Sequence, residues 1–345
     1  MSASAPSSAS PGPPVDLAVT LGGTRLTNPV LTAAGCVRLG RDLEQLLDLP
    51  ALGAYVTPTV TLHPVTGPPG RRVVESPSGF VHATGLAGPG LSGFLATELP
   101  WLAARSVRTI VSVAAASLGE YAELARHIAA APGVTGVEVR LGPPGAAALG
   151  LHRSDEPYHA AKVLATVRRE LPSGALLLAK LAPLPGRVGE FARACADAGA
   201  DGVTVADAAE ALALDPTTLR PALGSGARDV PHAGLSGPAL HPIALRCVWE
   251  AHAAVPTLPV VGCGGVASAA DALAMIAAGA TAVQVGSSVF ADPTTPARVL
   301  AGLADLVSGH GATAVAGLVG YAHRPEHAPA RTLATPTEGP EGVRR

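Results

Sequence analysis

Along most of this chain, short apolar runs alternate with longer segments in which apolar residues recur every three or four positions. The short runs are typical of buried strands, and the longer segments are typical of amphipathic helices. We expect strands at 28–35, 53–60, 109–115, 136–142, 176–183, 201–207, 258–264 and 282–288. We expect helices at 41–48, 93–104, 118–131, 156–171, 187–198, 241–254, 268–278 and 295–308.

A strand followed by a helix, repeated eight times, predicts an α/β protein with a parallel sheet. The strands are almost continuously apolar, as strands covered on both faces are. Eight repeats favour a closed (β/α)8 TIM barrel over an open doubly wound sheet. Two connections are long, at 60–92 and 207–237, and we expect them to cover the active site because barrel sites lie at the carboxyl ends of the strands.

The two ends of the chain differ in composition from the rest. Residues 1–14 are mostly Ser, Ala and Pro without a basic or apolar segment, which predicts a disordered tail and no signal peptide. Residues 322–345 are also expected to be a disordered tail, leaving a single barrel domain at 15–321.

Composition narrows the class of protein. Of 345 residues, 48% are hydrophobic and the net charge is −2, so nothing indicates a nucleic-acid or membrane partner. The four cysteines form no CxxC pair, which argues against a metal centre and predicts reduced thiols in the cytoplasm. The uncharged segment 272–291 is interrupted by Gly279, Gln284 and Gly286, so we expect helix, turn and strand there, and not a membrane span.

Glycines close the last two predicted strands. Gly264 and Gly265 follow the seventh strand, and Gly286 and Ser287 follow the eighth. In a barrel these strands are neighbours, and bare backbone N–H groups at their ends predict a phosphate cradle. The alternative is that these glycines only form tight turns.

Lys180 stands out because the chain has 24 basic residues and only one other lysine, Lys162. It lies inside the apolar run ALLLAKLAP, where an unpaired cation is costly. A lysine here could stabilise the negative charge of a reduced cofactor. It could instead extend to solvent or pair with a buried carboxylate.

Five segments together resemble the dihydroorotate dehydrogenases, from about residue 15 to about residue 310. They are LPVVGCGGVASAADALAMIAAGATAVQVGSSVF, GLSGPALHPIALRCVWE, NPVLTAAGCV, TGLAGPGLSGF and LLAKLAPLPGRVGEFARACADAGADGVTV. The resemblance implies FMN as cofactor and small-molecule hydride transfer. It assigns contacts with FMN to Ala34, Gly35, Thr57, Thr59, Lys180, Gly237, Gly264, Gly265, Gly286 and Ser287.

The residues that bind and deprotonate the substrate in the family pattern are replaced in this chain. The lysine after the second strand is Pro58, and the cysteine of the loop after the fourth strand is Pro143. Proline has no titratable group and cannot be a general base. The family's asparagines are replaced at His82, Gly88, Arg140, Gly145 and Asp207, which predicts weakened binding of a pyrimidine.

Three of these positions carry new chemistry. His82 is a candidate general base, or an ordinary loop histidine. Asp207 could orient substrate or accept a proton, or cap the next turn. Arg140 could bind a substrate carboxylate, or pair with Glu138 or an acidic loop. Cys36 and Cys263, beside the glycines, are expected to be packing residues.

The sequence therefore predicts an FMN-dependent oxidoreductase with Lys180, His82 and Asp207 as catalytic residues and Arg140, His82 and Asp207 at the substrate. Dihydroorotate is the substrate by resemblance. The resemblance also implies a homodimer, and a soluble acceptor or separate electron-transfer subunit remains open. Two alternatives are a flavin- or phosphate-binding barrel without turnover, acting as a sensor or partner, and a barrel enzyme for a sugar phosphate.

Overall fold

The structure is a computed structural model that describes residues 15–37, 41, 44–224 and 230–325. The two predicted tails therefore lie outside the described residues, except for 322–325. The expected boundary at 321/322 stays a prediction, although a 3-10 turn, Tyr321–His323, continues two residues past it. His323 stacks on Trp249 with ring centroids 3.6 Å apart, and the ring of His252 lies 4.9 Å from that of His323.

Within the described residues, eight parallel strands form one sheet in the order β3-β14-β13-β10-β9-β8-β7-β4. The edge strands β3 and β4 are joined by a bridge between Leu31 and Ala54, which closes the sheet into a (β/α)8 barrel. The predicted fold and all eight predicted strands are confirmed. The bounds are β3 Val30–Thr32, β4 Tyr55–Val56, β7 Thr109–Val113, β8 Val134–Arg140, β9 Leu176–Leu181, β10 Gly202–Val205, β13 Val260–Cys263 and β14 Ala280–Val285.

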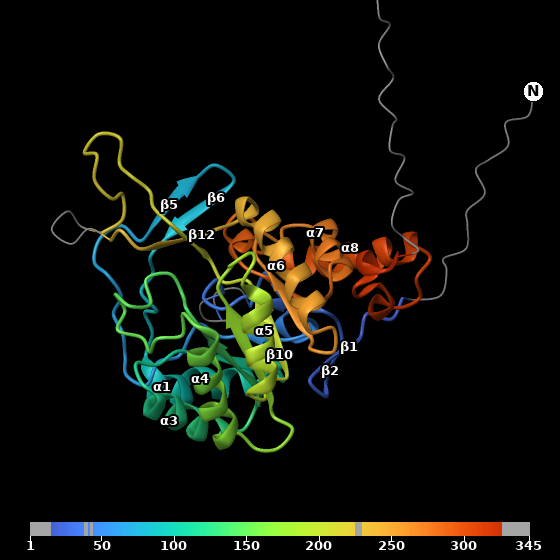
Figure 1. Ribbon diagram of the computed structural model, residues 1–345, viewed down its shortest axis with the longest axis horizontal. Helices are drawn as coiled ribbons and strands as arrows, with labels where there is room; N and C mark the ends of the chain where they lie inside the picture. The colour runs from blue at the N-terminus through green and yellow to red at the C-terminus, as the bar shows by residue number, and fades with distance from the viewer. Residues whose placement is uncertain (1–14, 38–40, 42–43, 225–229, 326–345) are drawn as a thin grey trace, which may run out of the picture.

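Helices cover the outside of the barrel, and seven of the eight predicted helical segments are confirmed among the described residues (Figure 1). The bounds are α1 Gly90–Gly93, a π-helical turn Phe94–Glu98, α2 Leu99–Ala104, α3 Leu118–Ala129, α4 Pro157–Glu170, α5 Val188–Asp197, α6 His241–Ala254, α7 Ala269–Ala277 and α8 Thr295–Gly309. The helix expected at 41–48 is wrong in its described part, since residues 44–46 form a turn. A separate 3-10 turn, Leu49–Ala51, begins three residues later and contains Pro50, so the segment is too short for a stable helix.

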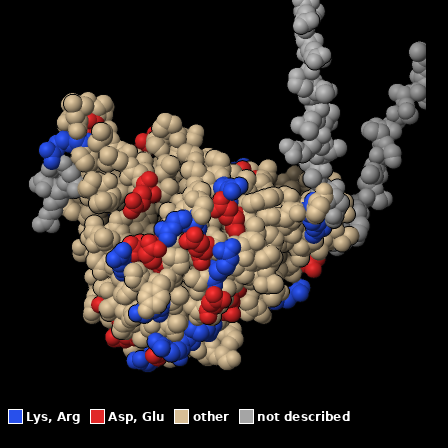
Figure 2. Space-filling view, in the orientation of Figure 1, with Lys and Arg blue, Asp and Glu red and all other residues tan. Residues whose placement is uncertain are grey.

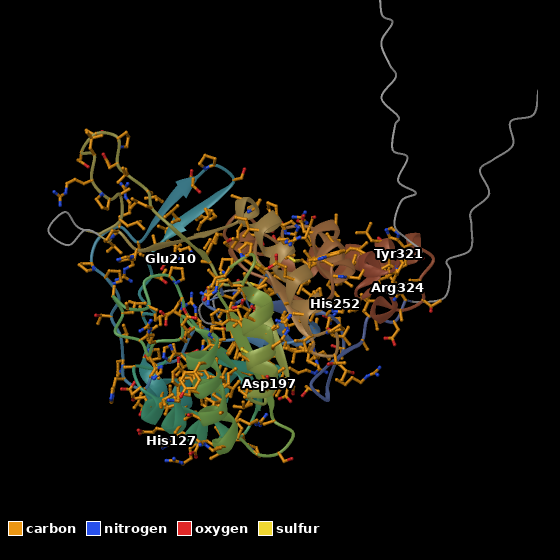
Figure 3. The ribbon with its side chains drawn as sticks, viewed as in Figure 1. His127, Asp197, Glu210, His252, Tyr321 and Arg324 are labelled. Carbon is orange, nitrogen blue, oxygen red and sulfur yellow. The ribbon has the colours of Figure 1, made fainter. Side chains whose placement is uncertain are left out.

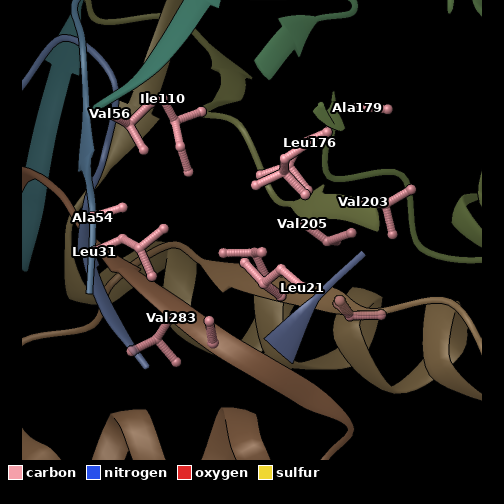
Figure 4. Close-up of a cluster of buried hydrophobic side chains, with 14 of the residues drawn as sticks. Leu21, Leu31, Ala54, Val56, Ile110, Leu176, Ala179, Val203, Val205 and Val283 are labelled. Carbon is pink, nitrogen blue, oxygen red and sulfur yellow. The ribbon is translucent and has the colours of Figure 1, made fainter. Parts of the chain in front are cut away.

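A hairpin that the sequence analysis missed closes the amino-terminal end of the barrel. Strands β1 (Val19–Leu21) and β2 (Thr24–Leu26) pair antiparallel through the turn at Gly22 and Gly23. The fully buried Leu21 points among barrel side chains that include Leu31, Val205 and Val283 (Figure 4). The hairpin therefore acts as a hydrophobic plug for this end.

The two long connections form a second, antiparallel sheet in the order β11-β12-β6-β5. Its strands are β5 Val73–Ser76, β6 Gly79–His82, β11 Ala209–Ala211 and β12 Ala233–Ser236. Strands β5, β6 and β12 project together from the barrel in Figure 1. This sheet places His82 beside the carboxyl ends of the barrel strands, where the connections were expected to cover a site.

Acidic and basic side chains are interspersed on the face in Figure 2. No helix in the described part of the chain is both long and apolar enough to cross a membrane.

Candidate active site

One cavity gathers most of the residues predicted to act. It has a volume of about 860 Å³ with its open mouth included, and lies at the carboxyl ends of β3, β9, β10, β13 and β14. This is the end of the barrel where enzymes of this fold place their sites. The predicted residues that line it are Ala34, Gly35, His82, Lys180, Asp207, Gly237, Gly264, Gly265, Gly286 and Ser287.

The glycines at one end of the cavity leave no room for side chains. Gly264 and Gly265 have positive φ values of 121° and 69°. A Cβ atom on Gly265 would lie 2.7 Å from the Cβ of His241 and 2.8 Å from the carbonyl oxygen of Gly237. Gly286 faces them from β14, which pairs with β13. The two glycine sites are therefore adjacent, and backbone rather than side chains lines the space, as a phosphate cradle requires.

These residues fit the FMN that the resemblance implies. The cradle formed by Gly264, Gly265, Gly286 and Ser287 suits a phosphate, and the same cavity continues to Lys180. A single continuous cavity thus offers both a phosphate end and a charged end.

Lys180 at the other end is buried, with 3% of its surface exposed. Its Nζ donates a hydrogen bond to Oε1 of Gln284 at 2.7 Å and lies 3.6 Å from Oε1 of Glu138. Burial alone would lower the pKa of Lys180, but the charges of Cys263, Glu138 and Asp207 around it raise the pKa above its ordinary value. The two alternatives for Lys180 therefore hold together: it lines the cavity and it pairs with a core carboxylate.

Arg140 and Asp207 form a two-pronged ion pair beside the cavity. Nη2 of Arg140 donates to Oδ1 of Asp207 at 2.8 Å, and its Nε donates to Oδ2. Burial would raise the pKa of Asp207, but Arg140 outweighs it and lowers the pKa. Asp207 therefore stays ionised and is a weak base, which favours the orienting role. Arg140 has the acidic partner that was its alternative to a substrate carboxylate, although that partner is Asp207 and not Glu138.

His82 closes β6 and faces the same part of the cavity as Asp207 and Ala208. Burial lowers its pKa, and the nearby Arg140 lowers it further against the opposing effect of Asp207. The imidazole is therefore neutral at neutral pH, the form that accepts a proton.

Thr57 and Thr59 are not brought to this cavity. They line a separate apolar cavity of about 1010 Å³ with Tyr55, Phe94 and Trp101. The hydroxyl of Thr57 accepts from the backbone N–H of Ser112, and that of Thr59 bonds the Ser112 hydroxyl. Their contact with FMN stays a prediction.

The two cysteines beside the glycines line the cavity and are packed there. Burial raises the pKa of Cys36 to about 12 and also raises the pKa of Cys263, so both thiols are protonated at neutral pH. Among the described residues, all four cysteines are free and no side-chain group could hold a metal ion.

Sequence reasoning missed other residues that shape the site. Glu138 and Gln284 interact with Lys180, and each is a polar residue inside an otherwise apolar strand, which was the available signal. Phe80 and Phe290 line the cavity and contact each other edge to face, 6.2 Å between centroids. Nothing in the sequence brings these two rings together, since their contact depends on how the second sheet lies over the barrel.

Comparison with known proteins agrees with this geometry. The family model described as dihydroorotate dehydrogenase matches residues 16–307. A protein of Desulforudis audaxviator (strain MP104C), named dihydroorotate dehydrogenase B (NAD(+)), catalytic subunit, is 40% identical over 312 residues, covering 90% of this chain and 98% of that protein. A protein of the same name from Geotalea daltonii is 38% identical over 305 residues, covering 88% of this chain and 97% of its own length.

Proposed function

This chain belongs to the dihydroorotate dehydrogenase family, and we propose that it oxidises dihydroorotate, or a close cyclic analogue, as the catalytic subunit of a larger enzyme. It is an FMN-dependent oxidoreductase that acts on CH–CH donors. The observation that supports the proposed reaction is the single cavity in which a glycine cradle, Lys180, His82 and Asp207 meet.

FMN, when bound, supplies the acceptor for the hydride that leaves one carbon of the substrate's CH–CH unit. Gly264, Gly265, Gly286 and Ser287 would bind its phosphate through the backbone. Lys180 holds a positive charge in the cavity wall, where it stabilises the negative charge that reduction brings. Burial strengthens this interaction because little water screens it.

The proton from the neighbouring carbon needs a base, since the family's cysteine is Pro143 here. We assign this role to His82, which is neutral and faces the cavity. Asp207, fixed by Arg140, presents an ionised carboxylate that orients the substrate. His82 would therefore accept the proton, and Asp207 would accept hydrogen bonds from the substrate in the same cavity.

The relatives' name, dihydroorotate dehydrogenase B (NAD(+)), catalytic subunit, supports a second subunit that carries electrons onward to NAD⁺. We propose that this chain likewise oxidises the substrate and that a second subunit passes the electrons on to NAD⁺. The homodimer and the cytoplasmic location expected from the sequence stay predictions.

Anaerobic mixing of the purified, FMN-loaded protein with dihydroorotate tests the proposal. The flavin absorbance near its visible maximum should bleach within the mixing experiment, and orotate should form in equal amount. Yellow protein that keeps its absorbance would contradict dihydroorotate as substrate and favour a flavin-binding barrel without this turnover. Protein that retains no FMN on desalting would contradict the cofactor site itself.

A further inference from the structure

Glu138 is a carboxylate sealed inside the barrel, with 0% of its surface exposed. Its Oε2 accepts hydrogen bonds from the Thr204 hydroxyl at 2.8 Å and from Nε2 of Gln284 at 2.6 Å. Its Oε1 has no hydrogen-bond donor within the described structure. A buried charge that is only half satisfied is costly, so a compensating interaction is needed.

Two contacts connect Glu138 to Lys180 at the FMN cavity. Lys180 Nζ lies 3.6 Å from the free Oε1, and Gln284 bridges the two residues by accepting from Lys180 and donating to Glu138. Glu138 does not line the cavity, whereas Lys180 does. The carboxylate therefore lies one residue behind the cavity wall.

Other charged and titratable groups also surround Lys180, and each has its own partner or environment. Asp207, which follows β10, is neutralised by Arg140, which closes β8. Burial keeps the thiols of Cys263, on β13, and Cys36, after β3, protonated. Among the described residues, Glu138 is thus the carboxylate that forms an ion pair with Lys180.

We propose that Glu138 is a positioning residue that keeps Lys180 charged and fixed at the wall of the FMN cavity. Without Glu138, Lys180 keeps its hydrogen bond to Gln284 but loses its paired carboxylate, and it would lose its proton more easily. A neutral lysine no longer stabilises the negative charge of reduced flavin. The inference rests on FMN binding in this cavity and is independent of the identity of the substrate.

The test is the reduction potential of bound FMN as a function of pH in the full-length protein carrying Glu138→Gln. At acid pH, where Lys180 keeps its proton, removal of a negative charge should raise the potential above that of the native protein. At alkaline pH Lys180 should be neutral in the variant, and the potential should fall below the native value. The difference between variant and native protein should therefore decrease through one transition as pH rises.

Thr204→Val is the matched control, because it removes a hydrogen bond to Glu138 and leaves the charge. Its potential should follow the native pH profile, and Glu138→Asp should restore most of that profile. A Glu138→Gln protein that binds FMN with a potential parallel to the native one at every pH would overturn the proposal. So would a transition that persists in Glu138→Gln combined with Lys180→Met, which lacks the titrating amine.

If Glu138→Gln fails to fold, the double variant that combines it with Lys180→Met still tests the proposal. If the single variant fails to fold because Lys180 is buried without a counter-charge, adding Lys180→Met should restore folding, since it removes the charge of the lysine. A double variant that fails to fold would show that Glu138 is needed for a reason other than Lys180. Loss of dihydroorotate oxidation alone bears on the proposed reaction, whereas the potential of bound FMN bears on Glu138.

Discussion

Arg140 and Asp207 are 67 residues apart in the chain and form a two-pronged ion pair over the carboxyl end of β9. Arg140 closes β8 and Asp207 follows β10, and both strands pair with β9. The pair therefore lies beside Lys180, which is the register partner of Arg140. It provides a fixed carboxylate at the cavity and leaves the barrel end electrically balanced.

Asp207→Asn should destabilise the fold by roughly 3–5 kcal/mol, because it leaves the half-buried Arg140 cation without a counter-charge. Chemical denaturation at neutral pH measures the change. Glu170→Gln is the matched control, since it breaks a surface pair with the exposed Arg126 and should leave the stability close to native. Equal losses for the two variants would contradict the burial argument.

The same pair predicts how acid affects stability. The pKa of Asp207 is lowered from 3.8 in the folded protein, so its contribution is complete well above that pH. It is lost as the pH falls through the lowered folded-state pKa. The stability difference between native protein and Asp207→Asn, measured by denaturation at several pH values, should therefore shrink in acid and stay constant near neutrality. A difference that does not change down to acid pH would place the effect elsewhere.

Gly265→Ala should weaken FMN binding by about tenfold or more. The residue has a φ of 69°, and its new Cβ would meet His241 and the Gly237 carbonyl, with strain of about 1–3 kcal/mol. Fluorescence titration of the apoprotein with FMN measures the affinity. Gly309→Ala, which ends α8 with no atom within 4 Å of the new Cβ, should bind FMN like the native protein.

The barrel and the glycine-lined end of its cavity were predictable because they depend on local patterns. Each strand is an apolar run, and the glycines that follow β13 and β14 can be read from the sequence without knowing how the strands are arranged. The Arg140–Asp207 pair was not predictable as a pair, since it arises from two strands placed on either side of β9. Helical periodicity predicted a helix at 41–48, but residues 44–46 form a turn, because Pro50 lies too close for a helix to continue. The hairpin of β5 and β6 carries a turn signal at Pro77 and Ser78 that could have revealed it.

Leu21→Ala should destabilise the protein by about 2–5 kcal/mol, because it leaves a cavity where the amino-terminal hairpin plugs the barrel. Leu46→Ala, at a position with 54% of its surface exposed, should change stability by no more than about 0.5 kcal/mol. Denaturant unfolding of both variants measures the contrast. If Leu21→Ala is as mild as the control, the hairpin is not a structural plug.

His82→Gln should slow the anaerobic reduction of bound FMN by dihydroorotate by about 10²–10⁴-fold, while FMN content and stability stay close to native. The base acts in its neutral form, and burial lowers its pKa below the ordinary 6.5. The native rate should therefore be constant near neutrality and fall as the pH drops through that lowered pKa, and this acid limb should be missing from the variant. His127→Gln is the control, because His127 lies on α3, away from the cavity, and bonds only the carbonyl of Glu123 (Figure 3). A His82→Gln protein that reduces FMN at the native rate, or that keeps the acid limb, would assign the proton transfer to another group.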